Sequence, residues 1–343
     1  MKLGIVGLPG SGKSTVFEAL TQKAAAGPKG ETCIGTVRVP DNRLDVLNEM
    51  YGRKKKIYAQ VEYLLPGTAS HTRPGGRDSQ PWNLVKDCDA LIHVIRNFKV
   101  YGLEDPTPRE DFHKLDQDLM LADLVVVENR LERLELDGKR GKKIEEEELS
   151  LLNECHLKLE TEVPLRKISD LASAQHLRGY TFLSAKQVLV LFNNEDEVHE
   201  LPDAPELASQ ENCMVIRGKL EQELAQMSVE EADEFLTEFN ITASAMNRVI
   251  KRSHEVLGLI TFFTIGDKEV RAWTVEQGTC AIDAAEVIHT DMKKGFIRAE
   301  VLSYADLMDA GSYQAAKKKG TVRLESKTYD VKDGDIVYIR FNV

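Results

Sequence analysis

A glycine-rich stretch, Gly7-Leu8-Pro9-Gly10-Ser11-Gly12-Lys13-Ser14, decides the fold of this chain. It fits the pattern G-x-x-x-x-G-K-[ST] of a phosphate-binding loop, or P-loop. Residues 2–6 before it read as a short buried strand and residues 14–21 after it as a helix, which is the context that this loop requires. Short apolar strands alternate with helices further along, which predicts an α/β fold with a mostly parallel sheet.

The residue types in this loop suit the binding of a nucleoside triphosphate. Glycine adopts backbone conformations barred to other residues, so main-chain N–H groups can converge on an anion. The helix after the loop points its positive dipole end at the phosphates. Lys13 can reach the β- and γ-phosphates, and the Ser14 hydroxyl can bind Mg²⁺. We therefore expect ATP or GTP with Mg²⁺ as cofactors, bound by Gly10, Ser11, Gly12, Lys13, Ser14 and Thr15.

Three kinds of sequence divide the chain. Residues 1–114 and 181–256 carry the strand–helix alternation and form the two parts of the expected nucleotide-binding domain. Residues 115–180 are dense in Leu, Glu, Lys and Arg at helical spacing, and GKRGKK at 138–143 interrupts them, which predicts an inserted helical hairpin. Residues 257–343 predict a compact α+β module with a helix near 281–290. Strands are expected at 2–6, 37–40, 59–65, 90–95, 187–192 and 213–216, and in the module at 260–264, 269–273, 295–301, 321–324 and 337–341.

Composition and charge restrict the function classes. The 343 residues are 42% hydrophobic and 29% charged, which is ordinary for a globular protein of two or three domains. A formal net charge of -11 argues against a large basic face, so nucleic-acid contact needs a local patch and no DNA-specific binding is expected. The five cysteines form no close pair, which indicates free thiols in a reducing compartment. No apolar run is long enough for a bilayer and no secretory signal is present, so a cytoplasmic location without membrane contact is expected.

The C-terminal third carries a specific resemblance. Residues 255–264 (EVLGLITFFT), 269–274 (EVRAWT) and 294–301 (KGFIRAEV) closely resemble the TGS domain, a ubiquitin-like module, of the YchF / Obg-like ATPase family. The resemblance continues at 289–291, 331–335 and 341–343, and upstream at 39–44, 89–91 and 121–134, so it covers nearly the whole chain. It implies a P-loop domain interrupted by a helical hairpin and followed by the TGS module. It also implies binding of ATP or GTP, slow hydrolysis, and association with ribosomes or RNA through the TGS module and the hairpin.

The sequence departs from the family pattern where the γ-phosphate is sensed. The D-x-x-G segment is missing, because Leu65 stands at the position of the Asp and Thr68 at that of the Gly. The glycine-rich run beyond it reads PGGR at 74–77, and Thr32 is the only plausible switch threonine before the second strand. Leucine cannot ligate Mg²⁺ through water, so weak hydrolysis or none is expected.

Recognition of the base is ambiguous in the sequence. GTPases use N-K-x-D after a buried strand, whereas the family uses N-x-x-E and favours adenine. The strand at 187–192 is followed by Asn193-Asn194-Glu195-Asp196-Glu197, which gives Asn193 with Asp196 in register, or Asn194 with Glu197 after a slip of one residue. Arg217-Gly218-Lys219 stands at the family's last base-contacting loop. We expect Asn193 and Asp196 to contact a purine base, and a plain polar loop is the alternative.

The leading hypothesis is a nucleotide-binding accessory factor of the ribosome or of RNA. A small-molecule kinase is a second class, because the P-loop alone would suit one. A kinase needs a lid with arginines positioned at the phosphates and an acceptor site. The rest of this chain is instead predicted to form a helical hairpin and a TGS-like module. An interaction scaffold with a vestigial nucleotide site is a third class, which a binding titration would test.

Overall fold

The computed structural model describes residues 1–25, 31–67, 81–238 and 244–342. The chain forms two compact units. The first is built from Met1–Val37 and Glu62–Val249, and the second from Arg38–Val61 and Ile250–Val343. Within the described residues no helix combines the length and the apolar character needed to cross a bilayer.

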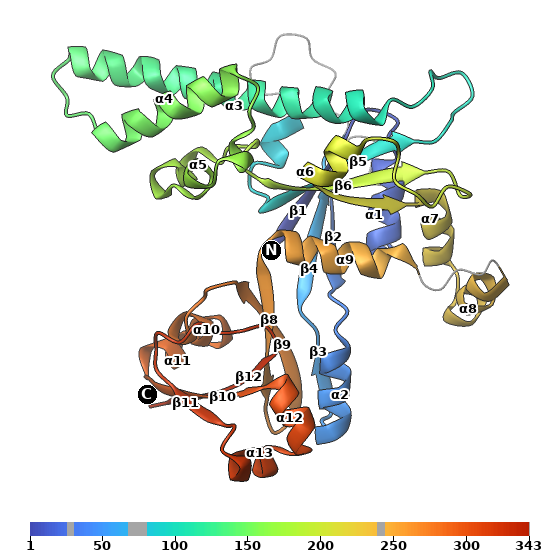
Figure 1. Cartoon of the computed structure of the whole chain (residues 1–343), viewed down its shortest axis with the longest axis vertical. Coiled ribbons are helices and arrows are strands. Elements are labelled where there is room, and N and C mark those ends of the chain that lie inside the picture. Colours follow the sequence, from blue (N-terminus) through green and yellow to red (C-terminus); the bar gives the residue numbers. More distant parts are fainter. Residues whose placement is uncertain (26–30, 68–80, 239–243, 343) are drawn as a thin grey trace. The chain divides into compact units, whose positions relative to one another are not determined.

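The first unit contains a six-stranded sheet in the order β2-β4-β1-β5-β6-β7 (Figure 1). β1 pairs in parallel with β4 and β5, and β5 and β6 continue the parallel arrangement. The neighbouring strands β5 and β6 are buried over six or more consecutive residues, because helices cover both faces of a parallel sheet. This confirms the predicted α/β class. The strands are β1 Lys2–Val6, β2 Cys33–Arg38, β4 Gln60–Leu65, β5 Ala90–Asn97, β6 Gln187–Asn194 and β7 Asn212–Ile216.

Helices surround this sheet, and the long helix α3 covers one face of it. Leu91 and Ile95 of β5 form an apolar cluster with Phe112 and Leu115 of α3, and all four side chains are nearly inaccessible to solvent. The helices of this part of the chain are α1 Lys13–Thr21, α3 Pro108–Lys139, α4 Glu146–Glu160, α5 Ser169–Ser173, α6 Pro205–Gln210, α7 Gly218–Gln226, α8 Val229–Glu238 and α9 Ala245–Val256, with 3-10 turns η2 Pro81–Leu84, η3 Leu165–Lys167 and η4 Gln175–Tyr180.

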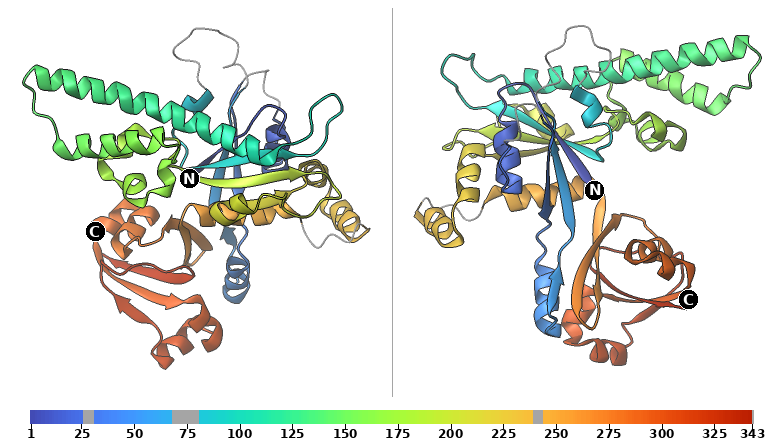
Figure 2. Two further views of the ribbon diagram at one scale, coloured as in Figure 1. Left: turned by 45° about the horizontal axis from the view of Figure 1, so that its top comes forward. Right: turned by 180° about the vertical axis from the view of Figure 1, so that it is seen from behind.

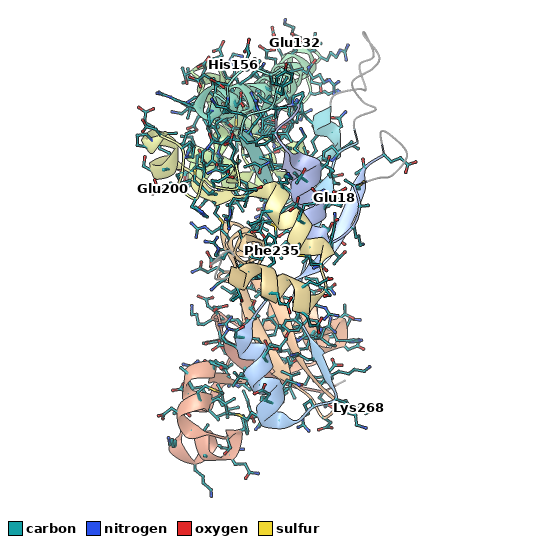
Figure 3. All side chains as sticks on the ribbon, turned by 90° about the vertical axis from the view of Figure 1, so that its right-hand side faces the viewer. Glu18, Glu132, His156, Glu200, Phe235 and Lys268 are labelled. Carbon is teal, nitrogen blue, oxygen red and sulfur yellow. The ribbon has the colours of Figure 1, made fainter. Side chains whose placement is uncertain are left out.

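The hairpin of α3 and α4 extends beyond the sheet (Figure 2). α3 begins at Pro108, before the predicted start at residue 115, because proline suits the first turn of a helix. Val127 of α3 and Leu152 of α4 are fully buried in an apolar cluster of their own. A bidentate pair between Arg130 and Glu148, at 2.9 and 3.0 Å, adds to this packing. Charged and polar side chains such as Glu132 and His156 cover the outside of both helices (Figure 3).

The second unit is a six-stranded sheet in the order β11-β10-β12-β8-β9-β3, with helices on both faces. Ala281 and Ala284 of α10 pack on the face that carries Val337. Tyr313 of α13 contacts Tyr338, the next residue of the same strand, which faces the other side. The strands are β3 Lys55–Ile57, β8 Leu259–Ile265, β9 Glu269–Glu276, β10 Phe296–Ser303, β11 Arg323–Glu325 and β12 Asp335–Phe341, and the helices are α2 Asn42–Tyr51, α10 Ala281–Ile288, α11 Thr290–Lys294, α12 Tyr304–Ala310 and α13 Tyr313–Lys319.

The sequence did not predict that residues 38–61 belong to the second unit. The sequence placed them in the first part of the nucleotide-binding domain, whereas α2 and β3 belong to the second unit. β3 pairs in parallel with β9, and Leu44 and Leu47 of α2 are fully buried. Arg43 of α2 binds Asp333 at 2.6 Å and lies over the ring of Phe263 at 5.3 Å. A segment this short cannot bury such side chains by itself, so it completes the C-terminal module.

Candidate nucleotide-binding site

The P-loop connects the carboxyl end of β1 to the first turn of α1. Gly10 and Gly12 have φ values of 80° and 92°, in the region that favours glycine. α1 starts at Lys13, and no side chain caps its N-terminus. The first N–H groups of this helix are therefore available to an anion.

Lys13 is held at this loop without a counter-anion among the described residues. Its Nζ donates hydrogen bonds to the carbonyl oxygens of Gly7, at 2.9 Å, and Leu8, at 2.8 Å. Burial lowers the pKa of Lys13 below its ordinary value, because the charged form is poorly solvated there. Ser14 is exposed and Thr15 is half-buried at the start of the helix. The Ser11 hydroxyl is buried and has no partner among the described residues. A phosphate group would supply the charge and the acceptors that this arrangement lacks.

Asn193 connects three segments around the P-loop. Its side-chain amide donates to the carbonyl oxygen of Ser11 at 3.1 Å, and its side-chain oxygen accepts from the backbone N–H of Gly218 at 2.9 Å. The residue is only 4% exposed. A Cβ at Gly12 would lie 2.2 Å from this amide nitrogen, so glycine is needed there for the close approach as well as for its φ. Asn193 therefore holds the P-loop against the end of β6 and the start of α7.

A cavity of about 420 Å³, here called the polar cavity, lies beside Asn193. Glu195 accepts a hydrogen bond from the backbone N–H of Lys99 at 2.8 Å. The backbone oxygen of Asp196 accepts from Arg217 at 3.3 Å, and no described side chain binds the Asp196 carboxylate. The cavity is lined by Gly12, Thr15, Phe98, Lys99, Asn193, Asn194, Glu195, Asp196, Glu197, Lys219 and Gln222.

Asn194, the asparagine of the alternative register, has a different role. Its side-chain oxygen accepts from Asn97 at 2.8 Å. Its side-chain nitrogen donates to the backbone oxygens of Val198, at 3.2 Å, and Glu200, at 2.9 Å. Both ends of this amide are occupied by the turn after β6, so Asn194 orders that turn.

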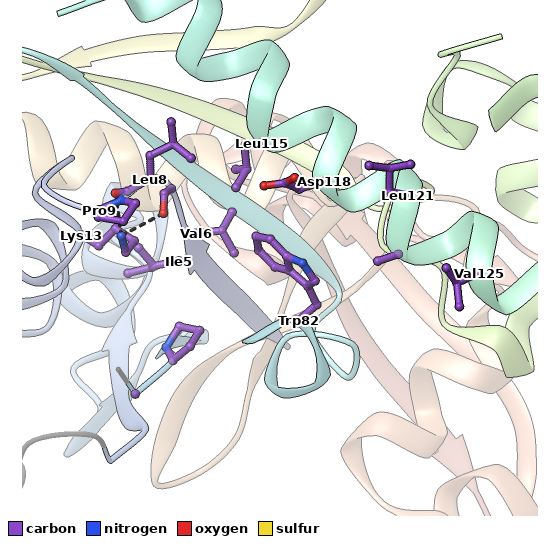
Figure 4. Close-up of a pocket in the computed structure, with 14 residues that line it drawn as sticks. Ile5, Val6, Leu8, Pro9, Lys13, Trp82, Leu115, Asp118, Leu121 and Val125 are labelled. Atoms are coloured by element: carbon purple, nitrogen blue, oxygen red, sulfur yellow. Dashed lines mark hydrogen bonds between the residues drawn. The ribbon is translucent and has the colours of Figure 1, made fainter. Parts of the chain in front are cut away.

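A second cavity of about 550 Å³, here called the apolar cavity, borders the P-loop at Gly7, Leu8, Pro9 and Lys13 (Figure 4). Trp82 of η2 and Leu121 and Val125 of α3 form much of its wall. Lys13 lines it from the P-loop, and Asp118 contributes a carboxylate. Leu121 is 59% and Val125 is 53% exposed.

The segment that would sense a γ-phosphate runs along the apolar cavity. Leu65 ends β4 and is buried, and Pro66 and Gly67 line the cavity. Thr68 and residues 74–77 lie outside the described residues. Thr32, the predicted switch threonine, is exposed. The described residues contain no group of three or more His, Cys, Asp or Glu side chains placed to hold a metal ion, so Mg²⁺ would depend on Ser14 and the phosphates.

Several cavity residues were not predicted from the sequence. Phe98 and Lys99 follow the carboxyl end of β5, at the sheet edge that also carries the P-loop and Asn193. Residues after adjacent parallel strands meet at one edge, so this position could have been predicted. Trp82 had no such signal, because nothing in its local sequence places it beside the P-loop.

Comparison with known proteins finds relatives that match this chain over nearly its whole length. A family described as YchF-GTPase_C, protein of unknown function (DUF933), matches residues 259–342. The "Ribosome-binding ATPase YchF" of Bacillus subtilis (strain 168) is 37% identical, with 99% of each chain covered. The chain belongs to the YchF family. A YchF protein of the same name from Escherichia coli O157:H7 is 35% identical and covers 100% of this chain and 99% of its own.

Solved structures agree with the YchF assignment. The Schizosaccharomyces pombe YchF GTPase superposes with a TM-score of 0.82 at 28% identity, covering 99% of this chain and 97% of that one. A GTP binding protein from Pyrococcus horikoshii OT3 gives a TM-score of 0.59 at 16% identity, with complete coverage of both chains, which shows a shared fold. The resemblance in the C-terminal third is thus confirmed as membership of the YchF family over the full chain.

Proposed function

We propose that this chain binds a purine nucleotide, ATP or GTP, with Mg²⁺. The observation that carries the proposal is the Lys13 ammonium, which is partly buried at a glycine-rich loop and bonded to carbonyl oxygens, with no carboxylate from the described part of the chain paired to it. The backbone of Gly10, Ser11 and Gly12 and the start of α1 would receive the phosphates. Ser14, exposed at the first turn, would ligate Mg²⁺. The names of the curated relatives support an ATPase of this type.

The polar cavity is the proposed place of the base. Its volume suits a purine, and the ring of Phe98 offers a flat apolar wall. Asn193 would act by fixing the P-loop beside the cavity, since both ends of its amide are occupied. The Asp196 carboxylate would then contact the base edge. The contact of Asn193 with Ser11 supports the register of Asn193 with Asp196, because Asn194 is used by its own turn.

Titration of the purified protein with non-hydrolysable ATP and GTP analogues, with and without Mg²⁺, tests this proposal. Lys13→Ala is expected to abolish binding while circular dichroism and the melting temperature stay unchanged. Lys13 would make a charge-assisted contact with phosphate, and its own hydrogen bonds go to carbonyl oxygens of the loop. Lys23→Ala, at an exposed lysine beyond the end of α1, is the matched control. Equal affinity in wild type and Lys13→Ala would exclude this loop as the phosphate site.

We propose that hydrolysis is very slow. Leu65 offers no carboxylate where the family has the Asp that reaches Mg²⁺ through water. The single-turnover rate should fall below the range of about 10⁻⁴ to 10⁻² per second that is typical of switch GTPases without an activator. Rapid-quench measurement with radiolabelled ATP and GTP gives this rate.

Leu65→Asp provides a second measurement of the same proposal. If the missing carboxylate limits the rate, this variant should hydrolyse faster than wild type at the same occupancy. A wild-type rate inside or above the stated range would mean that another residue does the work.

We further propose that the chain associates with the ribosome or its RNA in the cytoplasm. The relatives named ribosome-binding ATPases support this association. Residues 115–180, as an inserted hairpin, and residues 257–343, as the TGS module, are the proposed contact regions. Lys317 and Lys318 at the end of α13 are exposed and form no ion pair with a described residue, whereas Lys293 of α11 is bound by Asp283 and Glu286. Co-sedimentation with ribosomes, using Lys317→Glu with Lys318→Glu, tests the α13 contact.

A further inference from the structure

A third cavity, of about 520 Å³, lies at the amino ends of β5 and β6 and is here called the distal cavity. Asp89, just before β5, and Gln187, the first residue of β6, both line it. The P-loop and Asn193 lie at the opposite edge of this parallel sheet. Asn193 stands six residues beyond Gln187 on β6, which is roughly 20 Å at the rise of a strand. The distal cavity is therefore separate from the proposed nucleotide site.

Three cationic side chains from different segments line the distal cavity. Arg166 comes from η3, Arg178 from η4, and Lys186 from the residue before β6, and Asp89 is the one acidic residue among the described residues that line the cavity. Neither Arg178 nor Lys186 forms an ion pair with any described residue. Lys186 donates one hydrogen bond, to the carbonyl oxygen of Cys88 at 2.6 Å, although an ammonium has three donors. Arg178 and Lys186 thus bring more positive charge and more donors to the cavity than its lining acceptors satisfy.

Arg166 adds an independent observation. Its side chain is 3% exposed, and its two terminal nitrogens bind Asp116 at 2.7 and 2.9 Å and Glu211 at 3.1 Å. Its Nε is buried and has no hydrogen-bond partner among the described residues. Buried donors in folded proteins are nearly always bonded, so an acceptor is missing beside this residue. A ligand with anionic oxygens in the cavity would provide that acceptor.

The remaining wall shows what kind of molecule fits. Leu171, Leu177 and Phe182 give it an apolar side, and Ser169 and Thr181 add hydroxyl groups. Thr181 has a φ of 50°, which is strained for a β-branched residue, and such strain is often found at binding sites. The volume lies in the range of small-molecule sites. Arginine with lysine is the combination that proteins use for phosphate groups.

We propose that the distal cavity binds a small phosphate-bearing molecule with an apolar body. The phosphate would lie among Arg166, Arg178 and Lys186, and the apolar body would pack against Leu177 and Phe182. The ligand would be held without any chemical step. Because the cavity is formed at the base of the hairpin, by η3, α5 and η4, its occupation would stabilise the connection between the hairpin and the sheet.

Calorimetric titration in the Lys13→Ala background tests this proposal without competition from the P-loop. The probes are orthophosphate and phenyl phosphate, with phenol as the uncharged counterpart. Phenyl phosphate should bind more tightly than orthophosphate, and phenol should not bind. Arg178→Gln should weaken phenyl phosphate by about tenfold or more, since it removes a charge-assisted bond. Arg140→Gln, at an exposed arginine at the end of α3, should leave the affinity unchanged.

Two further measurements keep the proposal open to contradiction. Lys186→Gln should weaken binding as Arg178→Gln does, and the melting temperature of each variant shows whether it is folded. The proposal would be overturned if orthophosphate and phenyl phosphate bound equally well to the wild type and to both variants. It would also be overturned if phenyl phosphate gave no heat of binding at 10 mM, a concentration on the order of the weakest dissociation constant expected for such a site. Failure of this proposal would not affect the proposed nucleotide site. That site is tested separately, by titrating nucleotides into the wild type and into Lys13→Ala.

Discussion

The polar and apolar cavities border the same P-loop, but they differ in the residues that line them and in the kind of contact that each side makes with the loop. Gly12 and Thr15 line the polar cavity together with Glu195, Asp196 and Glu197. Lys13 lines the apolar cavity, whose wall is mostly aliphatic and aromatic. On the polar side, Asn193 is tied to the P-loop by its hydrogen bond to Ser11 and to α7 by the one from Gly218. On the apolar side, the described contacts with the P-loop are packing contacts from η2 and α3.

The two sides of the P-loop therefore have different roles. Hydrogen bonds depend steeply on distance and angle, so the polar side fixes where the P-loop stands. Apolar packing is non-directional, so the other side excludes water without imposing one position on Lys13. A substitution that breaks the hydrogen bonds of Asn193 should therefore change nucleotide affinity strongly. Substitutions of the η2 and α3 residues on the apolar side should act mainly on stability.

The largest expected effect distinguishes two glycines of the P-loop. Gly12→Ala introduces a Cβ 2.2 Å from the Asn193 amide and a strained φ, so the bond to Ser11 is lost. We expect nucleotide affinity to fall more than 100-fold, or about 3 kcal/mol. Gly10→Ala meets nothing within 4 Å and carries only the strain of φ, which is worth about 1–2 kcal/mol. Calorimetry on both variants measures the difference, and equal losses would show that the Asn193 contact does not matter.

A prediction of intermediate size tests whether water reaches the apolar side of the P-loop. His93 of β5 is stacked on Phe112 at 5.5 Å, and burial, with Arg166 and Lys13 nearby, lowers its pKa to about 3. The unfolded chain takes up this proton below about pH 6.5 and the folded chain does not, so stability is lost as the pH falls. Between pH 7.5 and 5.5 the loss should be about 1.4 kcal/mol.

Urea unfolding at the two pH values checks the His93 effect. The fluorescence of Trp82 reports on this unit once Trp273, the other tryptophan, is replaced by Phe. In a His93→Leu variant the same drop in pH should cost about 1.4 kcal/mol less than in wild type. An identical pH dependence in both proteins would mean that water reaches His93.

The smallest expected effect concerns the base. The Asp196 carboxylate can accept two hydrogen bonds from guanine, and adenine offers no such donor pair. The lysine that covers the base in GTPases is replaced by Asn194, so we expect ATP and GTP to bind within roughly tenfold, about 1.4 kcal/mol. Asp196→Ala should lower GTP affinity, and Glu197→Ala is the matched control for the other register. If Asp196→Ala leaves both affinities unchanged, the residue only shapes its loop.

Features that depend on local pattern were predicted from the sequence. The P-loop, its strand and its helix lie where the glycines and Lys13 placed them, and the two helices of the hairpin meet near the predicted basic turn at 138–143. Apolar runs such as that of β5, which is buried on both faces, predicted the parallel sheet. These features depend on residues that are close together in the chain, or on a motif whose context is fixed.

Features that the sequence did not predict depend on contacts between distant segments. The contact of Asn193 with the base stays a prediction, whereas its hydrogen bonds with Ser11 and Gly218 were not predicted, because only the fold brings these residues together. Trp82 was not predicted beside Lys13 for the same reason. The apolar residues of α2 gave no sign that this helix lies beside β9, because their pattern predicts that they are buried and does not identify the element that covers them.

The placement of residues 38–61 has a consequence for synthesis on the ribosome. α2 and β3 leave the exit tunnel early, but the strands that they join, from β8 onward, emerge only after the whole first unit. Leu44 and Leu47 must stay exposed during that interval, at about 5–20 residues per second. With roughly 200 residues between β3 and β8, the nascent chain carries the uncovered apolar face of α2 for about 10–40 seconds, which makes it a target for chaperones. The C-terminal module can close only when translation is almost complete.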